Sequence, residues 1–288
     1  MQPTLRGTDY AALCEGFAWR FPDRLNLAAQ VCDDWAADSP ERGAILDMRA
    51  GDMRLCSYGA LQRLSRRVEA WLRGQGVGRG DRVGVLLSQS PLCAAAHVAA
   101  WRMGAISVPL FKLFKHDALA SRLGDSGARA VVTDDEGAEM VAPFGLPTVT
   151  EDALPEPGVW PAVETGPEDP AVLIYTSGTT GKPKGALHGH RVLTGHLPGV
   201  EMSHDLLGQP GDVLWTPADW AWIGGLFDVL MPGLALGVPV VAARLPRFDV
   251  EQCMKICREA SVRNVFFPPT ALRMLKAEGA GISGLRSA

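Results

Sequence analysis

Short apolar runs alternate with helical patterns through much of this 288-residue chain. Apolar side chains recur at helical spacing from Leu61 to Leu72, and glycines follow to end that helix. Two more helices are predicted, one over 90–104 with Ser90 as its cap and one that ends at Gly124. The runs between these helices are typical of buried parallel strands, over 82–87, 105–110 and 128–134. The alternation predicts an α/β fold with a largely parallel sheet.

A stretch rich in proline and acidic residues, 141–170, divides this pattern into two parts. We interpret the stretch as a surface connection between two α/β subdomains, residues 1–165 and residues 166–288. The second part begins with a strand that ends at Tyr175, followed by a glycine-rich loop and a helix. Further strands are predicted over 212–217, 238–243 and 262–267, and further helices over 249–260 and 269–279. Both parts therefore follow the same α/β plan.

The composition is that of an ordinary globular protein, with 47% hydrophobic and 21% charged residues. A net charge of -4 and the lack of a long basic run argue against nucleic acid as a partner. The sequence shows neither a membrane-spanning stretch nor a signal peptide. The cysteines form no disulfide pattern, and Cys253 and Cys257 lack the further ligands that a zinc site needs. We therefore expect a cytoplasmic protein without a metal site of its own.

The segment from Tyr175 to Gly185, YTSGTTGKPKG, combines glycine, hydroxyl and lysine residues directly after a predicted buried strand. Its glycines allow the backbone to approach a ligand closely, and successive backbone N–H groups in such a turn bind anions. The hydroxyl groups and lysines add donors and positive charge, so the segment predicts a polyphosphate-binding loop. It is not the common P-loop, because Thr176 stands where that motif has glycine and Pro183 where it has serine or threonine.

TSGTTGKPKG resembles the signature motif of the adenylate-forming enzymes, which include acyl-CoA synthetases, luciferases and the adenylation domains of peptide synthetases. The resemblance covers most of the chain, and residues 215–241 and 265–275 are similar to the acyl-CoA synthetase branch in particular. It implies the large N-terminal domain of that fold, with two αβ-layered subdomains and mostly parallel sheets. In the family, a third subdomain and a small C-terminal domain follow.

The resemblance also implies a two-step reaction. A carboxylic acid attacks Mg²⁺-bound ATP to give an acyl-adenylate, and a thiol, usually that of coenzyme A, then takes the acyl group. ATP, Mg²⁺ and coenzyme A are the implied cofactors, and the implied catalytic residues are Thr176 and Lys184, which matches the family's fixed lysine. Lys182 lies at a variable position of the motif that can face solvent. The motif residues implied to hold the ATP phosphates are Thr176, Ser177, Gly178, Thr179, Thr180, Gly181, Lys182, Pro183 and Lys184.

Residues Trp222, Ile223 and Gly224 match the family segment that borders the acyl pocket and the coenzyme A tunnel. The same segment is also explained as the start of a buried helix, with Trp220 and Trp222 in the core. Acetate-specific relatives usually carry threonine at the position of Gly224, and the missing side chain favours a longer acyl chain. The expected substrate is therefore a short- or medium-chain carboxylic acid.

Asn264 and Thr270 match a turn that lies near the coenzyme A path in the family, so they are implied to contact coenzyme A. Thr270 is equally explained as the N-cap of the helix that follows a Pro-Pro pair. His188 and His190 have no acid placed in the sequence to form a proton relay. We therefore expect structural roles for both histidines.

The family's later motifs, among them the adenine-binding segment, the Thr-Glu motif and the ribose-binding aspartate, are not found in this sequence. We interpret the chain as the N-terminal portion of a longer enzyme and expect it to be inactive by itself. Two alternatives stay open: a non-catalytic remnant or partner-binding module, and an adenylation domain that delivers its acyl group to a carrier protein. The sequence does not predict the oligomeric state.

Overall fold

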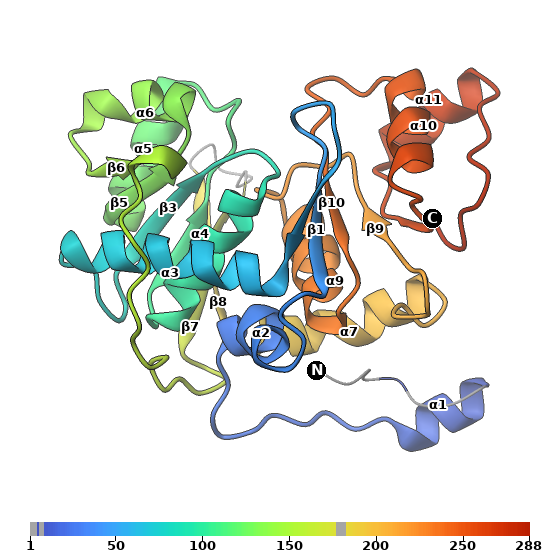
Figure 1. Ribbon diagram of the computed structural model, residues 1–288, viewed down its shortest axis with the longest axis horizontal. Helices are drawn as coiled ribbons and strands as arrows, with labels where there is room; N and C mark the ends of the chain where they lie inside the picture. The colour runs from blue at the N-terminus through green and yellow to red at the C-terminus, as the bar shows by residue number, and fades with distance from the viewer. Residues whose placement is uncertain (1–4, 6–8, 177–182) are drawn as a thin grey trace.

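The computed structural model describes residue 5, residues 9–176 and residues 183–288. Its strands form two sheets (Figure 1). The first sheet contains, in spatial order, β11 (Asn264–Val265), β9 (Leu214–Trp215), β10 (Val240–Ala242), β1 (Gly43–Asp47) and β2 (Arg54–Ser57). The second contains β6 (Thr148–Val149), β5 (Ala128–Thr133), β3 (Arg82–Leu86), β4 (Ile106–Pro109), β7 (Pro170–Thr176) and β8 (Lys184–Gly189).

Most neighbouring strands in the described part of the chain are parallel. The antiparallel pairs there are β1 with β2 and β7 with β8, each at one end of a sheet. The other pairings within the named sheets are parallel. This arrangement confirms the predicted fold class, an α/β structure with mostly parallel sheets.

Each sheet takes strands from both sides of the boundary expected between residues 165 and 166. β1 pairs with β10 in the first sheet, so residues early in the chain lie beside residues near its end. β7 and β8 follow the proline-rich stretch but join the second sheet next to β4. The proline-rich stretch is also more than a surface connection, because β6 lies within it and pairs with β5.

Helices lie between the sheets and on their outer faces. The outer face of the second sheet packs on α5 (His116–Ser126) and α6 (Asp135–Val141), and that of the first sheet on α10 (Val250–Glu259) and α11 (Pro269–Ala277). The main core lies between the sheets and includes side chains of α3 (Tyr58–Gly74), α4 (Pro91–Arg102), α7 (Val192–Ser203), α9 (Met231–Leu236), η1 (Ala29–Asp33) and η4 (Leu226–Leu230). Further short helices are α1 (Tyr10–Gly16), α2 (Asp34–Asp38), η2 (Ala142–Phe144), η3 (Glu151–Ala153) and α8 (Ile223–Gly225).

The ends of the helices follow capping chemistry. Ser90 begins α4 as predicted, since its side chain accepts a hydrogen bond from the N–H of Cys93 at 3.0 Å. The predicted end of α5 at Gly124 is wrong, because the helix continues to Ser126. Gly127 follows with a φ of 58°, a left-handed conformation that favours glycine and ends the helix there.

A buried ion-pair network fixes the helices between the sheets. Arg102 of α4 is buried and donates to the carboxylate of Asp33 at 2.6 and 2.9 Å and to the hydroxyl of Ser65 at 2.9 Å. Its guanidinium also lies 3.4 Å from Glu69 of α3, which pairs with Arg73 as well. Because each buried charge has an opposite partner, the network can hold α3 against α4 without an unpaired ion.

Candidate functional site

The hairpin of β7 and β8 carries the two ends of the glycine-rich segment. Thr176, the last residue of β7, lies directly opposite Lys184, the first residue of β8, and both are exposed. Opposite residues in an antiparallel pair project their side chains from the same face of the sheet. The hydroxyl of Thr176 and the ammonium group of Lys184 are therefore neighbours on one face.

Tyr175 anchors the end of β7. Its hydroxyl donates a hydrogen bond to the carboxylate of Asp125, on α5, at 2.6 Å. Burial raises the pKa of this phenol, so it remains a neutral donor. Pro183 is half-buried and leads into β8. The other expected phosphate ligands lie outside the described residues, so their contacts remain predictions: Ser177, Gly178, Thr179, Thr180, Gly181 and Lys182.

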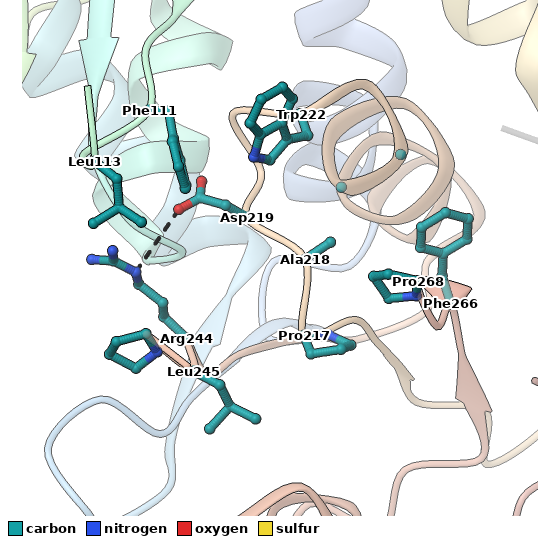
Figure 2. Close-up of a pocket in the computed structure, with 13 residues that line it drawn as sticks. Phe111, Leu113, Pro217, Ala218, Asp219, Trp222, Arg244, Leu245, Phe266 and Pro268 are labelled. Atoms are coloured by element: carbon teal, nitrogen blue, oxygen red, sulfur yellow. Dashed lines mark ion pairs between the residues drawn. The ribbon is translucent and has the colours of Figure 1, made fainter. Parts of the chain in front are cut away.

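A pocket of about 410 Å³ opens at the carboxyl ends of strands from both sheets (Figure 2). Segments that follow β9, β10 and β11 form one part of its lining, and Phe111 and Leu113, which follow β4, form another. Sheets of parallel strands bind ligands at this edge. β4 and β7 are parallel neighbours. The pocket and the start of the glycine-rich segment therefore lie at the same edge of the second sheet.

Two of the three residues expected at the acyl pocket line this pocket. Trp222 and Gly224 belong to the lining, whereas Ile223 does not and is 38% exposed. Trp222 is 49% exposed, and its ring lies 5.4 Å from that of Phe111. Trp220 is fully buried. The alternative interpretation, with both tryptophans in the core, therefore holds for Trp220 alone.

The two glycines after Ile223 allow close approach by other groups. A Cβ atom at position 224 would lie 2.9 Å from both Cε1 and Cζ of Phe266, closer than carbon atoms pack. The Phe266 ring thus occupies the volume that the absent side chain leaves. A Cβ atom at Gly225 would lie 2.3 Å from the backbone oxygen of Asp219, so that position also requires glycine.

A buried glutamine joins the two sheets beside the pocket. Gln89 follows β3 and is fully buried. Its Nε2 donates to the carbonyl oxygens of Thr216 at 3.0 Å and Ala218 at 2.6 Å, and its Oε1 accepts from the N–H of Ala243 at 3.0 Å. These three backbone groups follow β9 and β10. One side chain therefore ties the carboxyl ends of β3, β9 and β10 together.

Asp219 and Arg244 bring opposite charges to a lining that is otherwise mostly apolar (Figure 2). The Oδ2 atom of Asp219 lies 4.0 Å from the Nε atom of Arg244. Asp219 also accepts a hydrogen bond from the N–H of Ala221 at 2.9 Å, and Arg244 donates to the hydroxyl of Ser88 at 2.8 Å. Burial raises the pKa of Asp219, against the opposing effects of the Ala221 hydrogen bond and the Arg244 charge.

The structure places Asn264 and Thr270 outside this lining. Asn264 lies on β11, fully buried, and its Nδ2 donates to the hydroxyl of Ser287 at 2.8 Å. Thr270 is exposed, and the capping role predicted for it is wrong. The helix begins one residue earlier, at Pro269, so the N-cap is Pro268. The contacts with coenzyme A expected of Asn264 and Thr270 remain predictions.

The contacts of His188 and His190 support structural roles. His190 is fully buried, and its Nδ1 accepts a hydrogen bond from the N–H of Leu27 at 3.0 Å. Burial lowers the pKa of His190 to about 4, so the ring is neutral near pH 7. The His188 ring packs edge-on against Phe227 at a centroid distance of 5.1 Å. Burial lowers the pKa of His188 too, and the nearby His196 contributes to the same shift.

Among the described residues, no group of three or more His, Cys, Asp and Glu side chains is arranged to hold a metal ion. Cys253 and Cys257 are buried free thiols. Within the same part of the chain, no helix combines the length and the apolar character that a membrane crossing requires.

A family model described as "AMP-binding enzyme" matches residues 32–287. The chain belongs to this family. The match confirms the resemblance to the adenylate-forming enzymes. The chain is 30% identical to acetyl-coenzyme A synthetase of Shewanella sp. (strain ANA-3), over 91% of the chain and 46% of that protein. It is 29% identical to acetyl-coenzyme A synthetase of Escherichia coli (strain K12), over 96% of the chain and 48% of that protein.

Solved structures agree with the family. The crystal structure of an acyl-CoA synthetase from Brucella canis matches with a TM-score of 0.78 and 29% identity, over 91% of this chain and 51% of that one. The N-terminal domain of FACL13 from Mycobacterium tuberculosis matches with a TM-score of 0.79 over 91% of this chain and 68% of that one. At 22% identity, this second match shows a shared fold alone. The chain spans about half the length of the curated relatives that it matches.

For this member of the AMP-binding family, the sequence predicted the glycine-rich segment but missed most of the pocket. Phe111, Arg244 and Phe266 each lie just beyond the end of a strand. Residues at such positions commonly line ligand sites in parallel sheets, so this signal was available. No local sequence pattern marked Gln89, because its three hydrogen-bond partners lie 127, 129 and 154 positions away in the chain.

Proposed function

We propose that this chain is the acid- and phosphate-binding part of an enzyme that uses ATP to convert a short- or medium-chain carboxylic acid to an acyl-CoA thioester. The main support for the proposal is that the pocket and the glycine-rich segment lie at the same edge of the second sheet. This placement follows from the parallel pairing of β4 with β7. A phosphate-binding segment beside a mostly apolar pocket suits a reaction between a nucleotide and an acid with a hydrocarbon chain. The relatives named acetyl-coenzyme A synthetase support this reaction class.

In the first step, a carboxylate oxygen of the acid attacks the α-phosphorus of ATP. The bond to the bridging oxygen breaks, and pyrophosphate leaves with the electron pair. Charge develops on the phosphoryl oxygens, so positioning and electrostatic stabilisation supply most of the rate. Lys184 provides a positive charge and Thr176 a hydroxyl donor on the same face of the hairpin. Mg²⁺ commonly binds through substrate phosphates, so in this proposal it enters with ATP.

In the second step, the sulfur of coenzyme A attacks the acyl carbon. AMP leaves with the electron pair of the carbon–oxygen bond, and the thiol proton passes to solvent. The pocket between Phe111 and Trp222 gives the acyl chain a mostly apolar surface at the sheet edge. We place the reaction in the cytoplasm.

Lys184→Ala tests the first step through the carboxylate-dependent exchange of pyrophosphate into ATP, measured with acetate, butyrate and hexanoate. We expect a decrease of at least about 100-fold, because a charge aimed at the developing negative charge is lost. Lys184 is exposed, so the urea midpoint of unfolding should stay the same. Lys276→Ala removes another exposed lysine, on α11, and as the matched control should keep the wild-type rate.

If the chain shows no pyrophosphate exchange, calorimetry can measure the affinity of each variant for MgATP instead. Lys184→Ala should then bind MgATP more weakly than the wild type, and the control Lys276→Ala should bind it equally well. Exchange rates and affinities in Lys184→Ala that equal those of the wild type would refute the proposal. Better use of acetate than of butyrate and hexanoate would refute the proposed chain length. Coenzyme A and a pantetheine-loaded carrier protein, offered separately as thiol acceptors, distinguish a CoA ligase from an adenylation domain.

A further inference from the structure

The ring of Phe266 forms part of the pocket wall (Figure 2), and it lies next to the space that a Cβ atom at Gly224 would occupy. Phe266 directly follows β11 and is half-buried, with its ring packed against the main core between the sheets. The atoms nearest to Gly224 are Cε1 and Cζ, at the far end of the ring. The core therefore supports the ring on one side, and the pocket is its open side.

Position 224 controls where this ring can stand. A Cβ atom there would lie 2.9 Å from Cε1 and Cζ of Phe266. Carbon atoms pack at about 3.5–4.0 Å, so the ring would have to retreat by about 0.6–1.1 Å. Because the core blocks the other direction, the retreat would carry the ring into the pocket. Glycine at 224 thus enlarges the pocket indirectly, because it allows the Phe266 ring to pack close to α8.

We propose that Phe266, seated on Gly224, sets the length of the acyl chain that this pocket accepts. The inference rests on the proposed function and names the residue that limits its substrate. In this proposal, a saturated chain lies along Trp222 and Gly224 and ends against the ring of Phe266, since all three residues line the pocket. Acids short enough to stop at the ring bind, and longer acids are excluded by contact with it. The sequence pointed to Gly224 as the determinant of chain length, and the structure assigns that role to the side chain packed on it.

Phe266→Ala and Gly224→Ala should shift the chain-length preference in opposite directions. The measurement is the affinity of butyrate, hexanoate and octanoate for the 288-residue chain, by ligand-observed NMR without ATP. Each methylene group that becomes buried raises affinity about four-fold. We expect Phe266→Ala to raise the preference for hexanoate over butyrate by about 16-fold, since two methylene groups gain space. Gly224→Ala should lower the same ratio by about four-fold, as the ring advances into the pocket.

A double variant separates the ring from the glycine. In the Phe266→Ala background, Gly224→Ala has no ring to displace and should leave the ratio unchanged. Phe267→Ala is the matched control, because the adjacent Phe267 packs on the outer core with α10, and it should keep the wild-type ratio. Phe266→Leu keeps an apolar side chain against the core. It should shift the ratio in the same direction as Phe266→Ala, by less, even where the alanine variant fails to fold.

Three results would overturn the inference. One is an unchanged ratio in both Phe266 variants. Another is an effect of Gly224→Ala that persists without the ring. The third is the absence of binding of any of the three acids to the wild-type chain. These results are distinguishable from failure of the proposed function, which is judged by pyrophosphate exchange or MgATP affinity in Lys184→Ala.

Discussion

Replacement of Gln89 by leucine should strongly destabilise the protein. The Gln89 side chain is fully buried and makes three hydrogen bonds, to the carbonyl oxygens of Thr216 and Ala218 and from the N–H of Ala243. Leucine has a similar size but leaves these three backbone groups without this partner. Each buried polar group left unpaired costs about 1–3 kcal/mol. Three such groups give about 3–9 kcal/mol, and because losses above about 5 kcal/mol are exceptional for one substitution, we expect Gln89→Leu to lower the free energy of unfolding by about 3–5 kcal/mol.

Gln89→Glu isolates the direction of the hydrogen bonds, because glutamate has the same shape. An ionised carboxylate accepts from the N–H of Ala243 but donates nothing to the carbonyl oxygens of Thr216 and Ala218. Burial beside two carbonyl oxygens should raise the pKa of the introduced carboxyl in the folded state above its unfolded value of about 4.3. The destabilisation relative to the wild type should therefore be smallest below about pH 4.3 and should grow as the pH rises through the folded-state pKa.

Urea unfolding, followed by tryptophan fluorescence at pH 4 and pH 8, measures both effects. Gln75→Leu is the matched control, because Gln75 is exposed at the end of α3, and it should change stability by no more than about 0.5 kcal/mol. If Gln89→Leu lowers the free energy of unfolding by less than about 1 kcal/mol, the cost assigned to the unpaired backbone groups is refuted. A pH-independent cost for Gln89→Glu would refute the assigned hydrogen-bond directions.

Two further predictions concern stability. His97 on α4 is buried, neither ring nitrogen has a hydrogen-bond partner among the described residues, and burial lowers its pKa from 6.5 to about 3. The contribution of neutral His97 to the free energy of unfolding is therefore complete above about pH 6.5, and about 1.4 kcal/mol of it is lost per pH unit as the pH falls toward 3. His97→Leu should therefore reduce the decrease in unfolding free energy between pH 7.5 and pH 4. An unchanged dependence of unfolding free energy on pH would contradict this. Gly225→Ala sets a Cβ atom 2.3 Å from the backbone oxygen of Asp219 and should cost about 1–3 kcal/mol, whereas Gly199→Ala, in open space on α7, should gain up to about 1 kcal/mol. Equal urea midpoints for the two glycine variants would rule out the steric explanation.

The elements of the fold could be predicted where local sequence decides them. The strands β3, β5 and β7 are short apolar runs, and Ser90 has the chemistry of a helix cap, so each was found from its own residues. β8 was missed because Lys184–Gly189 carries no apolar alternation, and it forms a strand by pairing with β7. The pairing of β1 with β10 brings together distant parts of the chain, which local patterns do not determine.

The candidate site divides in the same way. The glycine-rich segment stays a prediction for residues 177–182, which lie outside the described residues, and it rests on residue types that each have a direct chemical meaning for phosphate binding. The pocket could not be predicted, since its walls follow strands that lie far apart in sequence. Trp220 and Trp222 are two positions apart, yet one is fully buried and the other is half exposed in the lining. The contact of Gly224 with Phe266 likewise depends on tertiary packing alone.

The shape of the pocket follows from how the two sheets are joined. Phe111 comes from the second sheet and Trp222 and Phe266 from the first, so any slip between the sheets changes the distance between opposite walls. The amide of Gln89 opposes such a slip at the sheet edge, and the ion pairs of Arg102 hold the helices α3 and α4 together between the sheets. Both groups are buried, and this constraint suits the proposed role of Phe266, which requires a wall that separates acids differing by one or two methylene groups. In the proposed role of Phe266, selectivity would therefore depend on buried polar contacts outside the pocket lining.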